Sequence, residues 1–155
     1  MQLKWHLSYA RGYMELGLLD EAAAELTKIG AQDSDRTAVL EVKAELHQEQ
    51  KDWASARDVT AELCRRQPGN AGWWIMFAYS TRRAGSLNAA EAILLAAERL
   101  HPDDATILFN LGCYACQRGD LSLASKRVHQ AIELDPKFEE LAKTDSDLEA
   151  LRASS

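Results

Sequence analysis

The chain has 155 residues, 46% of them hydrophobic and 27% charged, and its 24 acidic and 18 basic residues give a formal net charge of −6. Proteins that bind nucleic acid or anionic membranes usually present a basic surface, and no segment of this chain is basic enough for one. It also lacks the apolar run of a membrane span and the apolar centre of a signal peptide. Its odd number of cysteines, three, does not make a disulfide framework. These features predict a cytoplasmic protein without membrane or nucleic-acid partners.

A period of 34 residues runs through the chain. Alanine recurs once in each period, at Ala22, Ala56, Ala90 and Ala124. A second small residue recurs at Ala10, Ala44, Ala78 and Gly112. A glycine recurs at Gly17, Gly85 and Gly119, with Lys51 in the second period. Because this phase needs no insertion or deletion, the chain divides into four units, 3–36, 37–70, 71–104 and 105–138.

The predicted elements alternate helix and turn from the start of the chain. The first helix is expected to begin within a residue or two of Met1. The pattern is clearest in the third unit, where apolar residues at helical spacing mark a first helix that breaks at Gly85, a residue suited to a left-handed helix C-cap. A second helix carries apolar positions from Leu87 and stops before Pro102. Small residues at the recurring positions let the two backbones approach closely.

The units resemble the tetratricopeptide repeat (TPR), whose pattern is Trp-x2-Leu-Gly-x2-Tyr, then Ala-x3-Phe, then Pro. The third unit reads Trp74-x2-Phe77-Ala78, then Ala90-x3-Leu94, then Pro102. The fourth reads Leu108-x2-Leu111-Gly112, then Ala124-x3-Val128, then Pro136. The second departs most, with Lys43, His47 and Thr60 at positions that are usually apolar or aromatic. The resemblance covers residues 3–138 and implies an all-α, right-handed α-solenoid of four helical hairpins.

Residues 139–152 are expected to form a C-terminal capping helix within a single domain that spans residues 1–155. The last hairpin of a solenoid exposes its core unless something covers it. This segment continues an apolar edge that begins at Phe138 and includes Leu148. The edge is interrupted at residues 144–147, where a helix N-cap would fit.

Chemistry-bearing motifs are few. Cys113-x-x-Cys116 lies in the middle of a predicted helix, whereas redox cysteine pairs lie at a helix N-terminus. A zinc site would need two more ligands, and no second pair with that spacing exists. The histidines share no spacing, and neither a nucleophile motif nor a glycine-rich phosphate loop is present. We therefore predict no catalytic residue, metal or cofactor, and no enzymatic activity.

The resemblance implies that the first helices of the units line a concave groove, with side chains from positions 2, 5, 6, 9, 12 and 13 of each unit. These positions are acidic in the second unit and apolar with arginines in the third and fourth. Tyrosine, methionine, phenylalanine and arginine are typical of binding hot spots and adaptable interfaces. The predicted peptide-binding residues are Ile75, Met76, Tyr79, Arg82, Arg83, Phe109, Asn110 and Cys113. We expect one ligand side chain to touch both Tyr79 and Phe109. The alternative is that the two arginines pair with Glu45 or Glu49 within the chain.

The favoured hypothesis is a non-catalytic interaction module that binds a peptide or partner protein in this groove. The carboxylate clamp that some family members use for chaperone tails needs lysine and asparagine at positions 5 and 9, and Leu7 with Arg11 does not supply them. One alternative is a self-assembling homo-oligomer, because exposed tryptophans would favour a homodimer. The chain has four tryptophans, Trp5, Trp53, Trp73 and Trp74. Another is a small bacterial chaperone for a secretion substrate.

Overall fold

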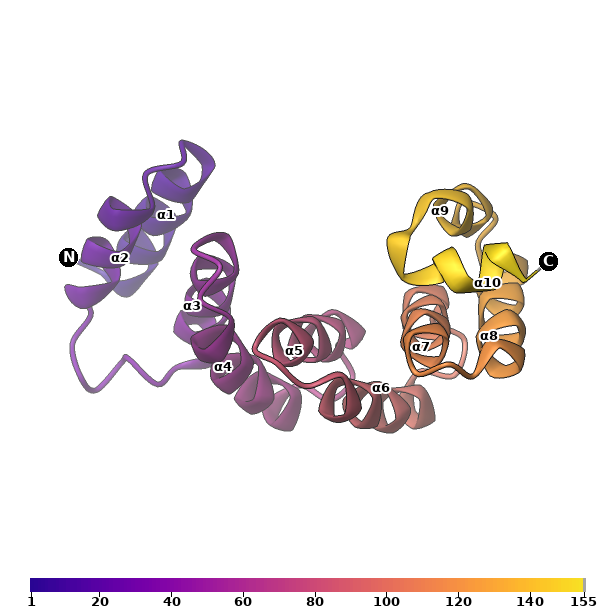
Figure 1. Ribbon diagram of the computed structural model, residues 1–155. Helices are drawn as coiled ribbons and strands as arrows, with labels where there is room; N and C mark the ends of the chain where they lie inside the picture. The colour runs from indigo at the N-terminus through magenta and orange to yellow at the C-terminus, as the bar shows by residue number, and fades with distance from the viewer. Residues whose placement is uncertain (155) are drawn as a thin grey trace. The chain divides into compact units, whose positions relative to one another are not determined.

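The computed structural model describes residues 1–154, of which 77% are helical, with no strand among them (Figure 1). This confirms the predicted all-α repeat fold. The first unit of the repeat contains α1 (Leu3–Glu15) and α2 (Leu19–Thr27), and the second contains α3 (Thr37–Glu49) and α4 (Trp53–Arg66). The third contains α5 (Ala71–Arg83) and α6 (Leu87–Leu100), and the fourth contains α7 (Ala105–Gln117) and α8 (Leu121–Leu134). The remaining elements are α9 (Phe138–Thr144), the 3-10 helix η1 (Ser146–Leu148) and α10 (Glu149–Ala153).

The 34-residue period is visible in the helix boundaries. The first helix of every repeat has 13 residues, and these helices begin one period apart, at Leu3, Thr37, Ala71 and Ala105. The turn around Gly85 separates α5 from α6, and α6 ends before Pro102, as predicted. Among residues 1–154, no helix combines the length and apolar composition needed to cross a bilayer. The cytoplasmic location stays a prediction.

The contacts divide the chain into two compact units. The first is Met1–Ser86, which holds α1 to α5, and the second begins at Leu87 with α6. The boundary falls between the two helices of the third repeat, a division that the sequence period does not mark. A single domain over residues 1–155 stays a prediction.

Close packing at the small residues closes the helical hairpins that lie within one compact unit. In the first compact unit, Ala10 and Ala22 of the first hairpin have no exposed surface, and neither do Ala44 and Ala56 of the second hairpin. In the second compact unit, a Cβ atom added to Gly112 of α7 would lie 2.8 Å from Cγ2 of Val128 on the neighbouring helix α8. These helices are therefore closer than a larger side chain would allow.

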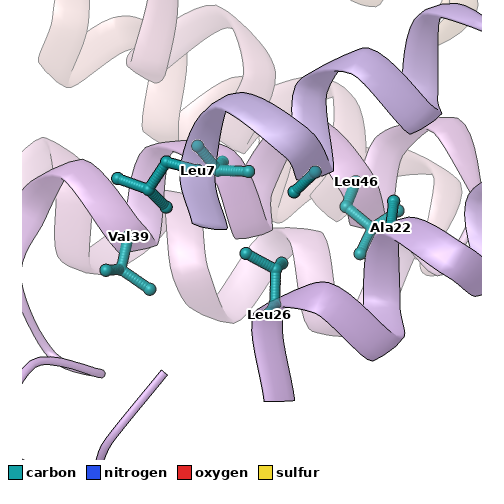
Figure 2. Close-up of a cluster of buried hydrophobic side chains, with 7 residues drawn as sticks. Leu7, Ala22, Leu26, Val39 and Leu46 are labelled. Atoms are coloured by element: carbon teal, nitrogen blue, oxygen red, sulfur yellow. The ribbon is translucent and has the colours of Figure 1, made fainter. Parts of the chain in front are cut away.

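Successive hairpins share a core. Leu7 of α1, Ala22 and Leu26 of α2, and Val39 and Leu46 of α3 belong to one buried cluster (Figure 2). The α3 residues therefore pack on the hairpin that precedes them. Burial of a large apolar side chain contributes about 1.5–3 kcal/mol, so the contact with α3 stabilises the first hairpin.

The second repeat accommodates its unusual residues by satisfying their polar atoms. The Thr60 hydroxyl is buried and donates to the Ala56 carbonyl at 2.7 Å. The Lys43 ammonium lies 3.5 Å from the Ser34 carbonyl, so its stem crosses a partly buried surface while its charge reaches a backbone acceptor. A buried polar group costs little once it is hydrogen-bonded.

Residues after Phe138 cover the fourth hairpin, as predicted. Phe138 and Leu148 are buried. The short helix α10 contacts both α7 and α8, and η1 contacts α7. The segment is not one continuous helix, because the chain breaks at Asp145, whose carboxylate accepts a hydrogen bond from the Asp147 amide at 2.9 Å. This break falls where the sequence predicted an N-cap. The Arg152 guanidinium holds the turn by donating to the Asp145 carbonyl at 2.7 Å.

The turn between paired helices is left-handed in the repeats. Gly17, Gly85 and Gly119 have φ values of 75°, 126° and 92°, which confirms the predicted left-handed cap at Gly85. Lys51 occupies the same place in the second repeat with φ of 58°. The left-handed backbone conformation costs a residue that has a Cβ atom roughly 1–2 kcal/mol of stability.

We expect Lys51→Gly to stabilise the protein by about 0.5–1 kcal/mol, because the relief of backbone strain exceeds the extra entropy that glycine has in the unfolded chain. Urea unfolding measures the change. Lys51→Ala keeps a Cβ atom and should give no such gain, and equal effects of the two substitutions would contradict the explanation.

An arginine network anchors the connection between the first two hairpins. Arg66 of α4 donates to the Asp35 carbonyl at 2.7 Å and to the Glu62 carboxylate at 2.8 Å. Hydrogen bonds from Arg65, and then from Arg66, lower the pKa of Glu62 from 4.5 to about 2. The carboxylate is therefore charged in the folded protein at pH values where it is protonated in the unfolded chain.

Because the folded pKa of Glu62 is depressed, its contribution to stability is present above the unfolded pKa and is lost as pH falls toward the folded one. We expect the difference in unfolding free energy between wild type and Glu62→Gln to shrink as pH falls from about 5 to about 2. Denaturant unfolding at several pH values measures it. Glu139→Gln, which removes an exposed carboxylate, is the control, and a difference that is constant with pH would refute the assignment.

Candidate functional site

The first compact unit carries a groove between α1 and α3. Arg11 of α1 and Glu45 of α3, which are one period apart, form two parallel hydrogen bonds of 3.1 and 3.2 Å. The Glu45 carboxylate raises the pKa of the Arg11 guanidinium through these bonds. The pair shows that equivalent positions of neighbouring repeats lie side by side on this face.

The groove is shallow and carries charges of both signs. A depression of about 300 Å³ is lined by Arg11, Met14, Glu15, Glu45 and Glu49. A neighbouring depression on α1 is lined by Lys4, Leu7, Ser8, Arg11, Gly12 and Glu15. The side chains come from positions that the resemblance assigns to the concave groove, and three of them are carboxylates.

Tyr79 of α5 is the large apolar residue of the predicted site that stays exposed, with 38% of its surface open. Its ring meets the Trp53 ring of α4 edge-on, with centroids 5.3 Å apart and planes at 73°. The Arg83 guanidinium lies 5.1 Å from the ring centroid and donates to the Tyr79 hydroxyl at 3.0 Å. Within residues 1–154, Arg83 therefore contacts Tyr79 and not Glu45 or Glu49. Two neighbours fix the tyrosine while part of its ring stays open.

The other predicted residues of α5 are less available. Met76 packs against a buried cluster of Leu40, Ala44 and Leu63, so it faces α3 and α4. Ile75 and Arg82 are half-buried.

The predicted residues of α7 belong to the second compact unit and lie largely under its own C-terminal segment. Phe109 is 4% exposed and packs on Phe138, with ring centroids 4.8 Å apart. Cys113 is buried, and Asn110 is half-buried. Sequence reasoning recognised Phe138 as the start of an apolar edge but gave no signal that it would cover Phe109. A ligand that touches both Tyr79 and Phe109 stays a prediction.

Cys64 and Cys113 lie in different chemical environments. Burial raises the pKa of the Cys64 thiol to about 12, which leaves it unreactive. Cys113 instead lies near two carboxylates, those of Asp145 and Asp147, with the three ligand atoms all within 4.8 Å of one another. The aspartates are far from Cys113 in sequence, so motif spacing missed the group. Zinc accepts both donor types, although the Asp145 carboxylate already accepts the Asp147 amide.

We expect the double substitution Cys113→Ala with Cys116→Ala to leave folding intact, to lower stability by about 1–2 kcal/mol because both side chains are buried, and to leave metal content near zero in both proteins. Elemental analysis and urea unfolding measure these quantities. A stoichiometric zinc signal in the wild type that disappears in the variant would overturn the packing role and make Cys113 and the two aspartates the candidate ligands.

Comparison with known proteins gives structural matches alone. No protein-family model matches the chain, and no curated protein matches it in sequence. The TPR protein TTC0263 of Thermus thermophilus matches with a TM-score of 0.65 and 20% identity, over 97% of this chain and 86% of its own. MamA from Desulfovibrio magneticus RS-1 matches with a TM-score of 0.74 and 16% identity, over 97% and 89%. YrrB, a TPR protein, matches with a TM-score of 0.68 and 16% identity, over 94% and 80%.

The chain has the tetratricopeptide-repeat fold. In its TPR units, position 9 is occupied by Arg11, Glu45 and Tyr79 on α1, α3 and α5, and position 13 by Glu15, Glu49 and Arg83. Apart from Met14, which is at position 12, the residues that line the depression between α1 and α3 belong to these two rows, and so does Tyr79. Within the first compact unit, these rows form the candidate site.

Proposed function

We propose that the protein is a non-catalytic interaction module that binds a peptide segment of a partner protein on the TPR positions of α1, α3 and α5. The observation that carries the proposal is Tyr79, which is partly exposed yet held by Trp53 and Arg83. Phe109 and Cys113 are buried, so the proposal rests on α5 and its neighbours.

A fixed aromatic side chain is suited to binding because little conformational entropy is lost when a ligand packs on it. Tyrosine also offers a hydroxyl at the edge of an apolar face. The guanidinium of Arg83 stands beside that ring and can donate to a ligand carboxylate. An apolar side chain with a nearby carboxylate is therefore the ligand feature that this part of the site fits.

The acidic end of the groove selects for the opposite charge. Glu15 and Glu49 line the same depression as the Arg11–Glu45 pair. That pair is well exposed, and exposed ion pairs contribute about 0–1 kcal/mol. A basic ligand residue can therefore displace Arg11 at little cost. The distribution of charge favours a peptide whose basic residue precedes or follows its apolar anchor.

Two solved structures with this fold support an interaction role. YrrB is described as having an unusual peptide-binding site, and Cut9 was solved with Hcn1 as a hetero-tetramer. A second candidate function, self-assembly, is favoured by exposed aromatic residues on α1.

We expect Tyr79→Ala to weaken the binding of peptides selected from a phage-displayed random library by about 2 kcal/mol or more, which corresponds to roughly 30-fold in Kd. Arg83→Glu should weaken the binding of peptides that carry a carboxylate, and this effect should shrink as salt is added. Isothermal titration measures both, with circular dichroism to show that the helices persist.

Lys126→Ala, a change at an exposed residue of α8, is the matched control and should leave affinity unchanged. If selected peptides bind the Tyr79 and Arg83 variants as tightly as the wild type, the site lies elsewhere on the molecule.

A further inference from the structure

An apolar stripe runs along one face of α1 and is open to solvent. It consists of Trp5, Tyr9, Gly12 and Leu16, which follow one another at spacings of four, three and four residues and therefore share one helix face. Trp5 is 47% exposed, Tyr9 49% and Leu16 74%. The two aromatic rings stack, with centroids 6.4 Å apart. Exposed apolar patches of this kind commonly mark interaction surfaces.

The repeat shows what covers this face elsewhere in the chain. Val39 and Leu46 lie one period after Trp5 and Gly12, and both are buried against the α1/α2 hairpin (Figure 2). Trp73, one period later again, packs against the core of the α3/α4 hairpin. These are the positions at which a TPR hairpin packs on the hairpin before it. On α1, residues 1–154 supply no such cover.

No contact within residues 1–154 requires a glycine at Gly12, in the centre of the stripe. Glycine is among the poorest helix formers. A Cβ atom added at Gly12 would meet nothing within 4 Å, in contrast to Gly112, where it would meet Val128 at 2.8 Å. A glycine on an exposed apolar helix face allows the backbone of another helix to approach closely.

The opposite end of the repeat is closed. The C-terminal segment covers the α7/α8 hairpin, with Phe138 and Leu148 buried. The C-terminal segment therefore occupies the face of the last hairpin on which a following hairpin would pack, and the partner that we consider for the α1 stripe is the stripe of a second copy. Contacts of a surface with itself are the usual basis of two-fold dimers.

The charges beside the stripe suit an antiparallel pair. Lys4 lies at the start of α1 and Glu15 at its end, both exposed. Lys4 lies over the Trp5 ring at 5.3 Å, and Glu15 forms no ion pair within residues 1–154. When two copies of α1 pack antiparallel about a two-fold axis, Lys4 of each copy meets Glu15 of the other. The helix dipoles also oppose one another in this arrangement.

We propose that two copies of this chain form a homodimer through their α1 stripes, packed antiparallel with Gly12 within the contact. The stripe uses repeat positions 3, 7, 10 and 14, whereas the proposed peptide site uses positions 9 and 13. The four stripe residues lie outside the peptide site, and Glu15 alone belongs to both proposals. The dimer is therefore tested first through Trp5 and Gly12, which the peptide site does not use.

Sedimentation equilibrium of the full chain tests the dimer over about 1 to 200 µM, because self-association depends on concentration. The average mass should rise from 17.2 kDa toward twice that value. Trp5→Glu should raise the dimer Kd at least about 30-fold. Leu95→Glu is the matched control, since Leu95 is a similarly exposed apolar residue on α6, and it should leave the Kd unchanged.

Two further variants separate association from folding. Gly12→Leu should raise the dimer Kd at least about tenfold by blocking close approach, while urea unfolding of the dilute protein shows no loss of stability, because leucine is the better helix former. Lys4→Glu and Glu15→Lys should each weaken the dimer, and the double variant should restore it. Restoration is specific to contact between copies, because the two residues lie at opposite ends of one helix.

A mass that stays at 17.2 kDa across the concentration range overturns the proposal. So does a dimer that Trp5→Glu leaves intact, or a mass that grows past the dimer without limit, which would indicate head-to-tail stacking. Failure of the double charge variant to restore association overturns the antiparallel arrangement.

Discussion

The close approach of paired helices at alanine and glycine underlies the rest of this structure. Where Ala10 and Ala22 meet within the first hairpin, and where Gly112 lies against Val128 in the last, no larger side chain separates the backbones. Bulky residues are then displaced to the flanks of each hairpin. Those flanks are too apolar to remain exposed, so each hairpin packs on its neighbour, as Val39 and Leu46 show. Repetition of the hairpin thus follows from the incomplete burial that one hairpin achieves.

This packing leaves α1 with two surfaces of different character. On α1, Arg11 and Glu15 point into the groove shared with α3, while Trp5 and Tyr9 lie where a preceding hairpin would pack. The Arg11–Glu45 ion pair in the groove is exposed and therefore weak. An apolar stripe gains from permanent burial. The proposed peptide site and the proposed dimer surface therefore use different faces of α1 and meet at Glu15.

The fold tolerates large changes of sequence because it depends on few residues. Solved structures that match over 97% of the chain share only 16–20% identity with it. Lys51 stands where other repeats have glycine, and Thr60 stands where the TPR pattern has phenylalanine. Each is accommodated locally, Lys51 by a left-handed backbone and Thr60 by a hydrogen bond to the carbonyl of Ala56. What must persist is the size of the residues where helices touch and the 34-residue spacing between them.

The sequence by itself determined the repeat and its phase and, in the third repeat, the left-handed turn at Gly85 and the end of the second helix before Pro102, because these depend on local spacing and on residue size. Position in the repeat also predicted which residues line the groove between α1 and α3. Only the tertiary structure decided which candidate residues are accessible. Phe109 is covered by Phe138, and Arg83 contacts Tyr79 instead of an acid of the second repeat. Accessibility depends on contacts between residues far apart in the chain, and a periodic pattern does not specify the single contacts at which one repeat differs from the next.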